Sequence, residues 1–437
     1  MRLAALILAG ACLAHPDTGT CAEALGLNEA YTLAEARSES LGINREEIKT
    51  AEARYWQALS TVFPQVGFTG SQRTQNNLGG GIDSGANGLR RDSWEGRLTV
   101  SQSLFSGFRE WNTAAAIKAD QRGLNSTLAR NRQLLYLDVS DLYHQITSLE
   151  QDQQALVEIL RTLEERRNEL AARVTLGRSR KGDLLASETE WADTRATLES
   201  VRGFTGAARE LFAYLIGRPA DSFTLTPPSG LPAADKLETY LWKTGARPDL
   251  VAAAERQTAT QRRSDAVRGE FLPTIKGNFS YLALEDPERE QEWNIVVTVD
   301  VPVFDGGLRV ARLSEAKSLY RASQLDFSRA RRLADNEVRV AYNNFVSAAG
   351  QAVQLHEAER AALENYQAQK KDYTLGRASN LDVLSALLRW KEIIRRRIAT
   401  ESLAHSTMIA LKVAAGEPPQ AENLPPKIVK SQEPSKE

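Results

Sequence analysis

Strict alternation of apolar and polar side chains marks four short stretches of the chain. These stretches are residues 65–76, 93–105, 274–285 and 291–303. In the second of them, Trp94, Leu98 and Val100 fall on one face. Arg97 and Thr99 fall on the opposite face. A period of two with unlike faces is typical of β-strands, so the pattern predicts four strands arranged as two consecutive pairs.

A long stretch of helical character follows each pair of strands. Residues 108–216 and 308–415 contain no proline and are rich in Ala, Leu, Glu, Arg and Gln, which favour helices. Their apolar residues recur at spacings of three, four and seven, the pattern of coiled coils. Gly177 and Gly376 interrupt the two stretches, as a glycine just beyond a helix end does. We therefore predict one long helical hairpin in each half of the chain.

The second half of the chain repeats the first. Identical residues recur at an offset of 199 positions, among them Trp94 and Trp293, Gly177 and Gly376, Asp183 and Asp382, and Gly217 and Gly416. Repeats of this length are too long for a solenoid and indicate a duplicated half-protein. We place the first repeat at residues 23–217, a proline-rich linker at 218–235 and the second repeat at 236–416, each repeat opening with a further helix. A disordered tail is expected over 417–437.

The N-terminal residues have the composition of a secretory signal peptide, which we place at residues 1–22. A positive charge precedes an apolar run, and small residues follow, so cleavage is expected after Ala22 or after Ala14. A lipoprotein signal would instead use Cys12. Since Cys12 and Cys21 are the only cysteines of the chain, no disulfide or cysteine-based metal site is expected beyond this segment.

The strand pattern fits β-hairpins that cross a membrane, with Trp94 and Trp293 as part of an aromatic girdle. Two hairpins of a soluble sheet are the alternative. In a membrane, four strands cannot close, and an open sheet edge cannot face lipid because its backbone groups would lack partners. The chain must then oligomerise, and the eight strands of a dimer would leave no pore. A trimer with twelve strands is the smallest assembly that opens a watery lumen.

Candidate chemistry is sparse. The four histidines, His15, His144, His356 and His405, are scattered along the sequence without the spacing of a metal site. We find no phosphate-binding loop and no nucleophile elbow, and a net charge of −1 does not point to nucleic acid. We therefore expect no enzyme activity, no metal or other cofactor, and no nucleic-acid partner.

These features together resemble the TolC family of outer-membrane efflux and secretion ducts. The resemblance rests on the signal-like start, the duplicated half, the strand ends Leu104-Phe105-Ser106-Gly107 and Val303-Phe304-Asp305-Gly306, and the hairpins broken at Thr-Leu-Gly-Arg. It covers residues 28–418. It implies a mainly helical homotrimer with a twelve-stranded membrane β-barrel in the outer membrane and a long α-helical barrel that crosses the periplasm of a Gram-negative bacterium.

The resemblance also implies a function. The trimer would be the outer-membrane exit duct of a tripartite efflux pump or of a type I secretion system. It would conduct substrates passively from an inner-membrane pump or ABC exporter and a periplasmic adaptor (a membrane fusion protein), while its barrel contacts outer-membrane lipid. The rival interpretation is a periplasmic coiled-coil adaptor or scaffold. Adaptors carry one hairpin, whereas here each of two hairpins follows its own strand pair, so we favour the duct.

Residues beside the two glycine breaks form the candidate functional site. Trimerisation would place the matched Asp183 and Asp382 in carboxylate rings, whose negative potential favours cations and can close a narrow pore. For Asp382, a capping box with Ser379 is an equal alternative. The resemblance implies that Tyr373 hydrogen-bonds to the first hairpin, with Asp183 as its partner. The tips are candidates for adaptor docking, solvated surface charge being the alternative for the two arginines; they comprise Gly177, Arg178, Gly376 and Arg377.

Overall fold

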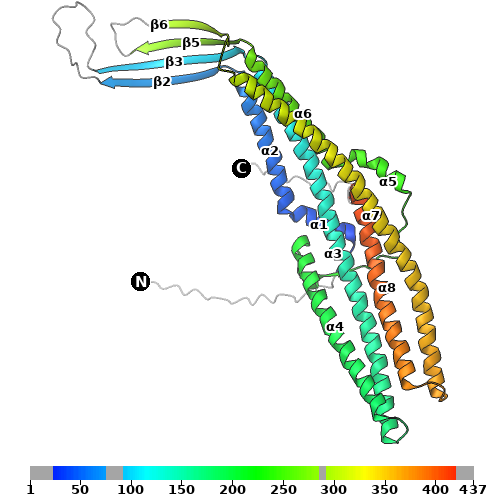
Figure 1. Ribbon diagram of the computed structural model, residues 1–437. Helices are drawn as coiled ribbons and strands as arrows, with labels where there is room; N and C mark the ends of the chain where they lie inside the picture. Colours follow the sequence, from blue (N-terminus) through cyan, green and yellow to red (C-terminus); the bar gives the residue numbers. More distant parts are fainter. Residues whose placement is uncertain (1–22, 75–91, 285–291, 420–437) are drawn as a thin grey trace, which may run out of the picture.

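The computed structural model describes residues 23–74, 92–284 and 292–419. The expected signal peptide over 1–22, with both cysteines, lies outside the described residues, as does the expected tail beyond residue 419. The described chain is elongated, with a small sheet at one end of a long layer of helices (Figure 1).

A single antiparallel sheet contains the four long strands. They are β2 (Gln65–Thr74), β3 (Asp92–Phe105), β5 (Thr274–Leu284) and β6 (Glu292–Asp300). Their order is β2-β3-β5-β6, so the two hairpins join side by side through β3 and β5. β6 ends three residues before the expected limit at 303, because Pro302 has no N–H to give to a neighbouring strand. β2 and β6 are the open edges of this sheet.

The strand register gathers apolar side chains on one face of the sheet. Two rows of directly paired residues run across all four strands, Val66-Val100-Phe279-Ile295 and Phe68-Leu98-Tyr281-Trp293. The neighbouring rows on the opposite face are polar, for example Gly67-Thr99-Ser280-Asn294. The expected alternation fails at one place: the register shifts between Ser103 and Phe105, so Phe105 and not Leu104 pairs with Ile275. A bulged residue of this kind changes the face that later residues occupy.

Two helices run the whole length of the layer. They are α3 (Arg109–Thr175) and α7 (Leu308–Thr374), each of 67 residues. At 1.5 Å per residue such a helix is about 100 Å long. Shorter helices pack beside them: α2 (Glu39–Ser60) and α6 (Pro248–Arg268) near the sheet, and α4 (Lys181–Ile216) and α8 (Asn380–Ala414) farther from it.

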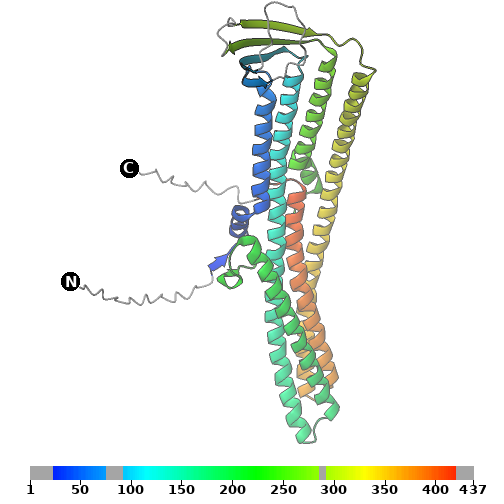
Figure 2. The same cartoon turned by 90° about the vertical axis from the view of Figure 1, so that its left-hand side faces the viewer.

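The layer has a different helix order in its two halves. Near the sheet the contacts follow the order α2-α3-α6-α7, and in the distal half α4-α3-α8-α7. The sheet-proximal and distal halves are thus built on the same two long helices (Figures 1 and 2). In the distal half, α8 is the helix that joins the second hairpin to the first through α3.

Short elements surround the middle of the layer. The strands β1 (Glu23–Leu25) and β4 (Phe223–Leu225) pair in parallel. The other elements there are α1 (Leu27–Arg37), α5 (Leu237–Lys243) and the 3₁₀ turns η1 (Ala220–Ser222) and η2 (Thr244–Ala246). A third turn, η3 (Gly269–Phe271), connects α6 to β5 at the sheet end. Phe212, Phe223 and Tyr31 are buried in the core that β1, β4 and α1 share with α3 and α4.

The end of α8 is held by buried polar side chains. Arg247 is 2% exposed and donates to the carbonyl of Ala414 at 2.9 Å, while its guanidinium pairs with Asp249 at 2.7 Å and Glu337 at 2.8 Å. A helix C-terminus leaves carbonyls without partners and carries partial negative charge, so cations there stabilise it. Gly416 follows the helix with φ +85°, and a Cβ there would lie 2.7 Å from Cγ of Arg247.

Within the described ranges, no helix is both long enough and apolar enough to pass through a membrane.

Candidate gate at the helical tips

Two matching turns close the helical hairpins at the end of the molecule opposite the sheet (Figure 1). Gly177 and Gly376 have φ of +66° and +73°, the left-handed conformation that favours glycine. The next residue donates its backbone N–H to a carbonyl five residues earlier: Arg178 to Arg173 at 2.8 Å, and Arg377 to Asp372 at 2.9 Å. These are Schellman motifs, which end one helix and turn the chain toward the next.

The predicted acidic residues both sit in the first turn of the returning helix. Asp382 accepts from the backbone N–H of Ser379 at 2.8 Å, and Ser379 Oγ accepts from the N–H of Asp382 at 3.3 Å. Asp183 accepts from the N–H of Arg180 at 3.4 Å and from Ser179 Oγ at 3.3 Å. Each carboxylate thus caps its own helix. The capping alternative stated for Asp382 is present in the structure, and Asp183 makes the equivalent contact. A ring of carboxylates in an assembled trimer stays a prediction.

The charge on Asp382 is favoured by its surroundings. Hydrogen bonds from the hydroxyl and the backbone N–H of Ser379 lower the pKa of this carboxyl group. The partial positive charge of the α8 N-terminus acts in the same direction. Asp382 is exposed and Asp183 is half-buried. Asp382 is therefore ionised at neutral pH.

Tyr373 makes a different contact from the expected one. Among the described residues, no hydrogen bond joins Tyr373 to Asp183. Its ring instead lies 3.8 Å from the guanidinium of Arg166 and 4.9 Å from that of Arg173. A guanidinium over an aromatic face is attracted by the ring quadrupole. Within one chain, Tyr373 therefore connects the two hairpins by stacking on Arg166 and Arg173, and a hydrogen bond from its hydroxyl in the assembled trimer stays a prediction.

The hydrogen-bonded link between the hairpins runs through Asn380, which sequence reasoning missed. Asn380 Oδ1 accepts from Nε and Nη2 of Arg166 at 3.0 and 2.9 Å, and its Nδ2 donates to the carbonyl of Asp183 at 3.3 Å. Its side chain is buried, at 4% exposure. The matched position in the first repeat is Lys181. In the sequence, the only feature that sets Asn380 apart is that it departs from the repeat. A buried amide needs hydrogen-bond partners, which is why this departure matters.

Two ion pairs continue the link between α8 and the first hairpin. Lys391 pairs with Glu190 of α4 at 2.5 Å, with both side chains less than one-fifth exposed. Arg395 pairs with Asp152 of α3 through two contacts of 2.7 and 2.9 Å. These polar contacts flank an apolar cluster in which Ile159 and Leu163 of α3 pack with Val383, Leu384 and Leu387 of α8. The seam between the first hairpin and α8 holds its register while its partners are charged, and it weakens when one charge is removed.

The three described histidines meet in the fold although they are scattered along the sequence. His144, His356 and His405 are far apart along the chain, but α3, α7 and α8 bring them to one region in the middle of the layer. His144 is buried at 5% exposure. Among residues 23–74, 92–284 and 292–419, no group of three His, Cys, Asp or Glu side chains is placed to hold a metal ion.

The sequence matches one known protein family over most of its length. The profile of the family described as "outer membrane efflux protein" matches residues 30–218 and 245–417. No curated protein matches the sequence significantly.

Several solved structures share the fold. The outer membrane protein VceC of Vibrio cholerae is 18% identical, with 90% of this chain and 96% of that chain covered and a TM-score of 0.80. The CmeC outer membrane channel of Campylobacter jejuni is 16% identical over 89% and 85%, with a TM-score of 0.78. The MtrE outer membrane channel of Neisseria gonorrhoeae, in its open state, is 20% identical over 90% and 89%, with a TM-score of 0.76.

Proposed function

This chain belongs to the outer membrane efflux protein family, and from this premise we propose that three copies assemble into the exit duct of a tripartite efflux system. It is a TolC-like channel protein of the outer membrane that extends into the periplasm, and it is not an enzyme. The assembly of three copies, the gate and the partners are the parts that we propose.

The segregated sheet is the observation that carries the proposal. Its apolar rows are in register across four strands, and the exposed side chains among them include Phe68, Trp293 and Ile295. No soluble layer covers that face within the described residues. An apolar face of this kind suits lipid, and the polar face opposite it suits a watery lumen. The open edges β2 and β6 would pair between neighbouring copies, since unpaired strand edges are not tolerated in lipid.

The helical layer supports the same assembly. Its outermost helices in the distal half are α4 and α7, and both expose large apolar side chains. Phe204 and Tyr214 on α4 are 62% and 71% exposed, and Val353 on α7 is 50% exposed. In a ring of three, α7 of one copy would pack against α2 and α4 of the next. The apolar side chains would then be buried, and the layer would close into a tube in line with the barrel.

The tips would form the regulated end of this tube. We infer that Asp183 and Asp382 line a cation-selective constriction, while Tyr373 holds the hairpins together near it. Gly177, Arg178, Gly376 and Arg377 are exposed on the turns. We propose that they dock a periplasmic adaptor, which connects the duct to an inner-membrane pump or ABC exporter. The name of the matched family favours efflux over type I secretion as the role of the complete system.

Fractionation followed by conductance measurements tests this function. A duct with a lipid-facing sheet stays in the outer-membrane fraction after carbonate and high-salt washing, and the purified protein conducts ions across a planar bilayer. An adaptor or scaffold, the rival function, would leave the membrane in the carbonate wash and give no conductance steps. Release by carbonate would overturn the proposal.

A further inference from the structure

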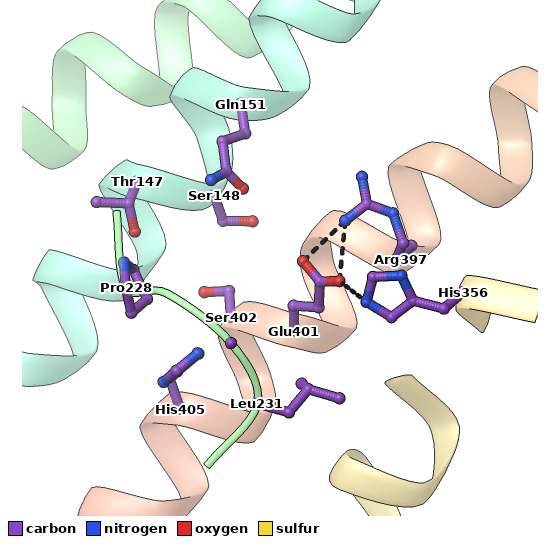
Figure 3. Close-up of a pocket in the computed structure, with 11 residues that line it drawn as sticks. Thr147, Ser148, Gln151, Pro228, Leu231, His356, Arg397, Glu401, Ser402 and His405 are labelled. Carbon is purple, nitrogen blue, oxygen red and sulfur yellow. Dashed lines mark hydrogen bonds and ion pairs between the residues drawn. The ribbon is translucent and has the colours of Figure 1, made fainter. Parts of the chain in front are cut away.

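The three described histidines meet beneath the linker that joins the two repeats. The linker segment around Pro228 and Leu231 crosses α8 and lines a cavity of about 210 Å³ (Figure 3). His405 of α8 and His356 of α7 line the same cavity. His144 of α3 lies directly against His405. The cluster therefore touches both long helices, α8 and the linker at once.

The contact between α3 and α8 is made by two imidazoles. The rings of His144 and His405 stack with their centroids 5.4 Å apart and an angle of 25° between their planes. Ser402 Oγ donates to the backbone carbonyl of His144 at 2.7 Å, close to the stacked rings. Nδ1 of His144 is buried and has no hydrogen-bond partner. Two neutral imidazoles can stack in this way, whereas two imidazolium ions would repel each other.

The contact between α7 and α8 does not involve the stacked rings. Nε2 of His356 lies 2.5 Å from Oε1 of Glu401 (Figure 3). Arg397 pairs with the same carboxylate at 2.8 Å and also with Glu359 of α7. These contacts join α7 to α8 independently of His144 and His405.

Other charged or titratable groups also face the stacked rings of His144 and His405. Those that face them from the packed elements are Glu29 on α1, Asp141 and Tyr143 on α3, Glu401, Arg397 and Lys412 on α8, and His356 and Glu359 on α7. The hydrogen-bond partners of Glu401 are Arg397 and His356, so its charge is already shared. Pro228 and Gly230, which the linker contributes, carry no charge.

Burial and the neighbouring ring set the order of protonation. Burial, with the charge of His405 added, lowers the pKa of His144 from 6.5 to about 4. Burial also lowers the pKa of His405, while a hydrogen bond to the backbone of Gly230 and the charge of Glu401 oppose that effect. The closed contact thus prefers neutral His144. The stability that neutral His144 contributes to this contact is fully present above pH 6.5 and is lost as the pH falls toward 4.

We propose that the histidine cluster is a proton-operated latch that releases the α7–α8 hairpin, as one unit, from α3. Protonation breaks the stacked contact on the α3 side of α8, while Arg397 keeps α8 paired with Glu359 of α7. If the chain works as the proposed duct, this release loosens the seam that Asn380, Lys391 and Arg395 continue toward the tip, and acid favours opening. That last consequence rests on the proposed function, whereas the release itself does not.

Amide hydrogen exchange of the assembled full-length protein tests the latch. After correction for the intrinsic exchange rate, peptides spanning residues 140–148 and 400–408 exchange faster at about pH 5 than at about pH 7. Linkage between a closed pKa near 4 and an open one near 6.5 gives a rise of roughly 20-fold for an opening that frees His144. Peptides of α7 spanning 352–360 show no such rise, because the pair of Arg397 with Glu359 keeps α7 on α8.

Three matched variants separate the roles of the histidines. His144→Gln removes the group whose pKa falls to about 4, so most of the acid-induced rise disappears; if this variant fails to assemble, His144→Asn tests the same position. His405→Gln leaves His144 buried and therefore lowers the rise only in part, and His356→Gln, outside the stacked pair, keeps the rise at 140–148. Wild-type exchange that is equal at both pH values overturns the latch, as does a His144→Gln variant that responds like the wild type.

Conductance recorded on the same samples keeps the latch and the duct apart. A latch that opens in a protein without conductance refutes the proposed function alone, because the exchange result does not depend on a pore. In a conducting protein, Asp183→Asn with Asp382→Asn retains the acid-induced increase in conductance, and His144→Gln loses it. The reverse result assigns acid sensitivity to the tip carboxylates and overturns the link between the latch and opening.

Discussion

Arginine placed on the two faces of β3 distinguishes a lipid-facing sheet from a soluble one. Val100 and Thr99 are neighbours on a central strand and point to opposite faces. Val100 pairs with Val66 and Phe279 in an apolar row, whereas Thr99 pairs with Gly67 and Ser280 on the polar face. The matched variants Val100→Arg and Thr99→Arg therefore add the same charge at almost the same depth, and only the face differs.

The magnitude follows from the position of Val100 on the strand. β3 continues to Phe105, which is about 17 Å farther along at roughly 3.3 Å per residue. One arginine side chain cannot cover that distance to reach water. Arginine on the lipid face near the middle of the membrane costs about 2–4 kcal/mol. At about 1.4 kcal/mol per factor of ten, the folding equilibrium constant falls roughly 30- to 700-fold.

Thr99→Arg has a much smaller expected effect. The threonine donates one long hydrogen bond, 3.3 Å, to the carbonyl of Gly67. Losing it in a watery lumen costs about 0.5–1.5 kcal/mol at most. The assay is a urea titration of folding into phospholipid vesicles, with the assembled species resolved by electrophoresis without heating. Equal destabilisation by both variants, or greater damage from Thr99→Arg, would show that the face assignment is wrong.

Three further predictions concern the helices. Arg247→Leu leaves Asp249 without its buried partner and should cost about 3–5 kcal/mol of unfolding free energy in a urea titration; an unchanged midpoint would refute the buried cap of α8. Tyr373→Phe keeps the ring on Arg166 and removes only the hydroxyl. Raised single-channel conductance with unchanged assembly would therefore reveal a hydrogen bond from this hydroxyl to a neighbouring subunit, and unchanged conductance would exclude one. Asp183→Asn combined with Asp382→Asn should reduce cation preference most at low salt, where screening is weakest; unaltered selectivity would leave only the capping role.

Periodicity was sufficient to locate the elements but not to arrange them. Alternation placed apolar residues such as Val66, Val100 and Ile295 on one face of their strands, and the register brings these residues into one row. A period of two does not state which strands pair, so the junction of β3 with β5 came only from the structure. The bulge between Ser103 and Phe105 was likewise invisible, because a bulge depends on the partner strand.

The candidate site was less accessible to sequence reasoning. The duplicated pattern identified Asp183 and Asp382 as equivalent, and both occupy the same capping position. The contacts of Asn380 and the meeting of His144 with His405 depend on how α3 packs against α8. Such contacts join residues more than 200 positions apart. Helical periodicity indicates which face of a helix is buried, but not which helix lies against it.

The number of chains in the membrane complex tests the central claim most directly, because four strands with two open edges make a duct only through assembly. Native mass spectrometry of the complex, extracted from outer membranes in mild detergent, counts the copies, and cross-linking in intact membranes checks that extraction has not changed them. Three copies, with cross-links between β2 of one copy and β6 of the next, are the predicted result. A complex that stops at two copies, or a monomer stable in the membrane, would contradict the account.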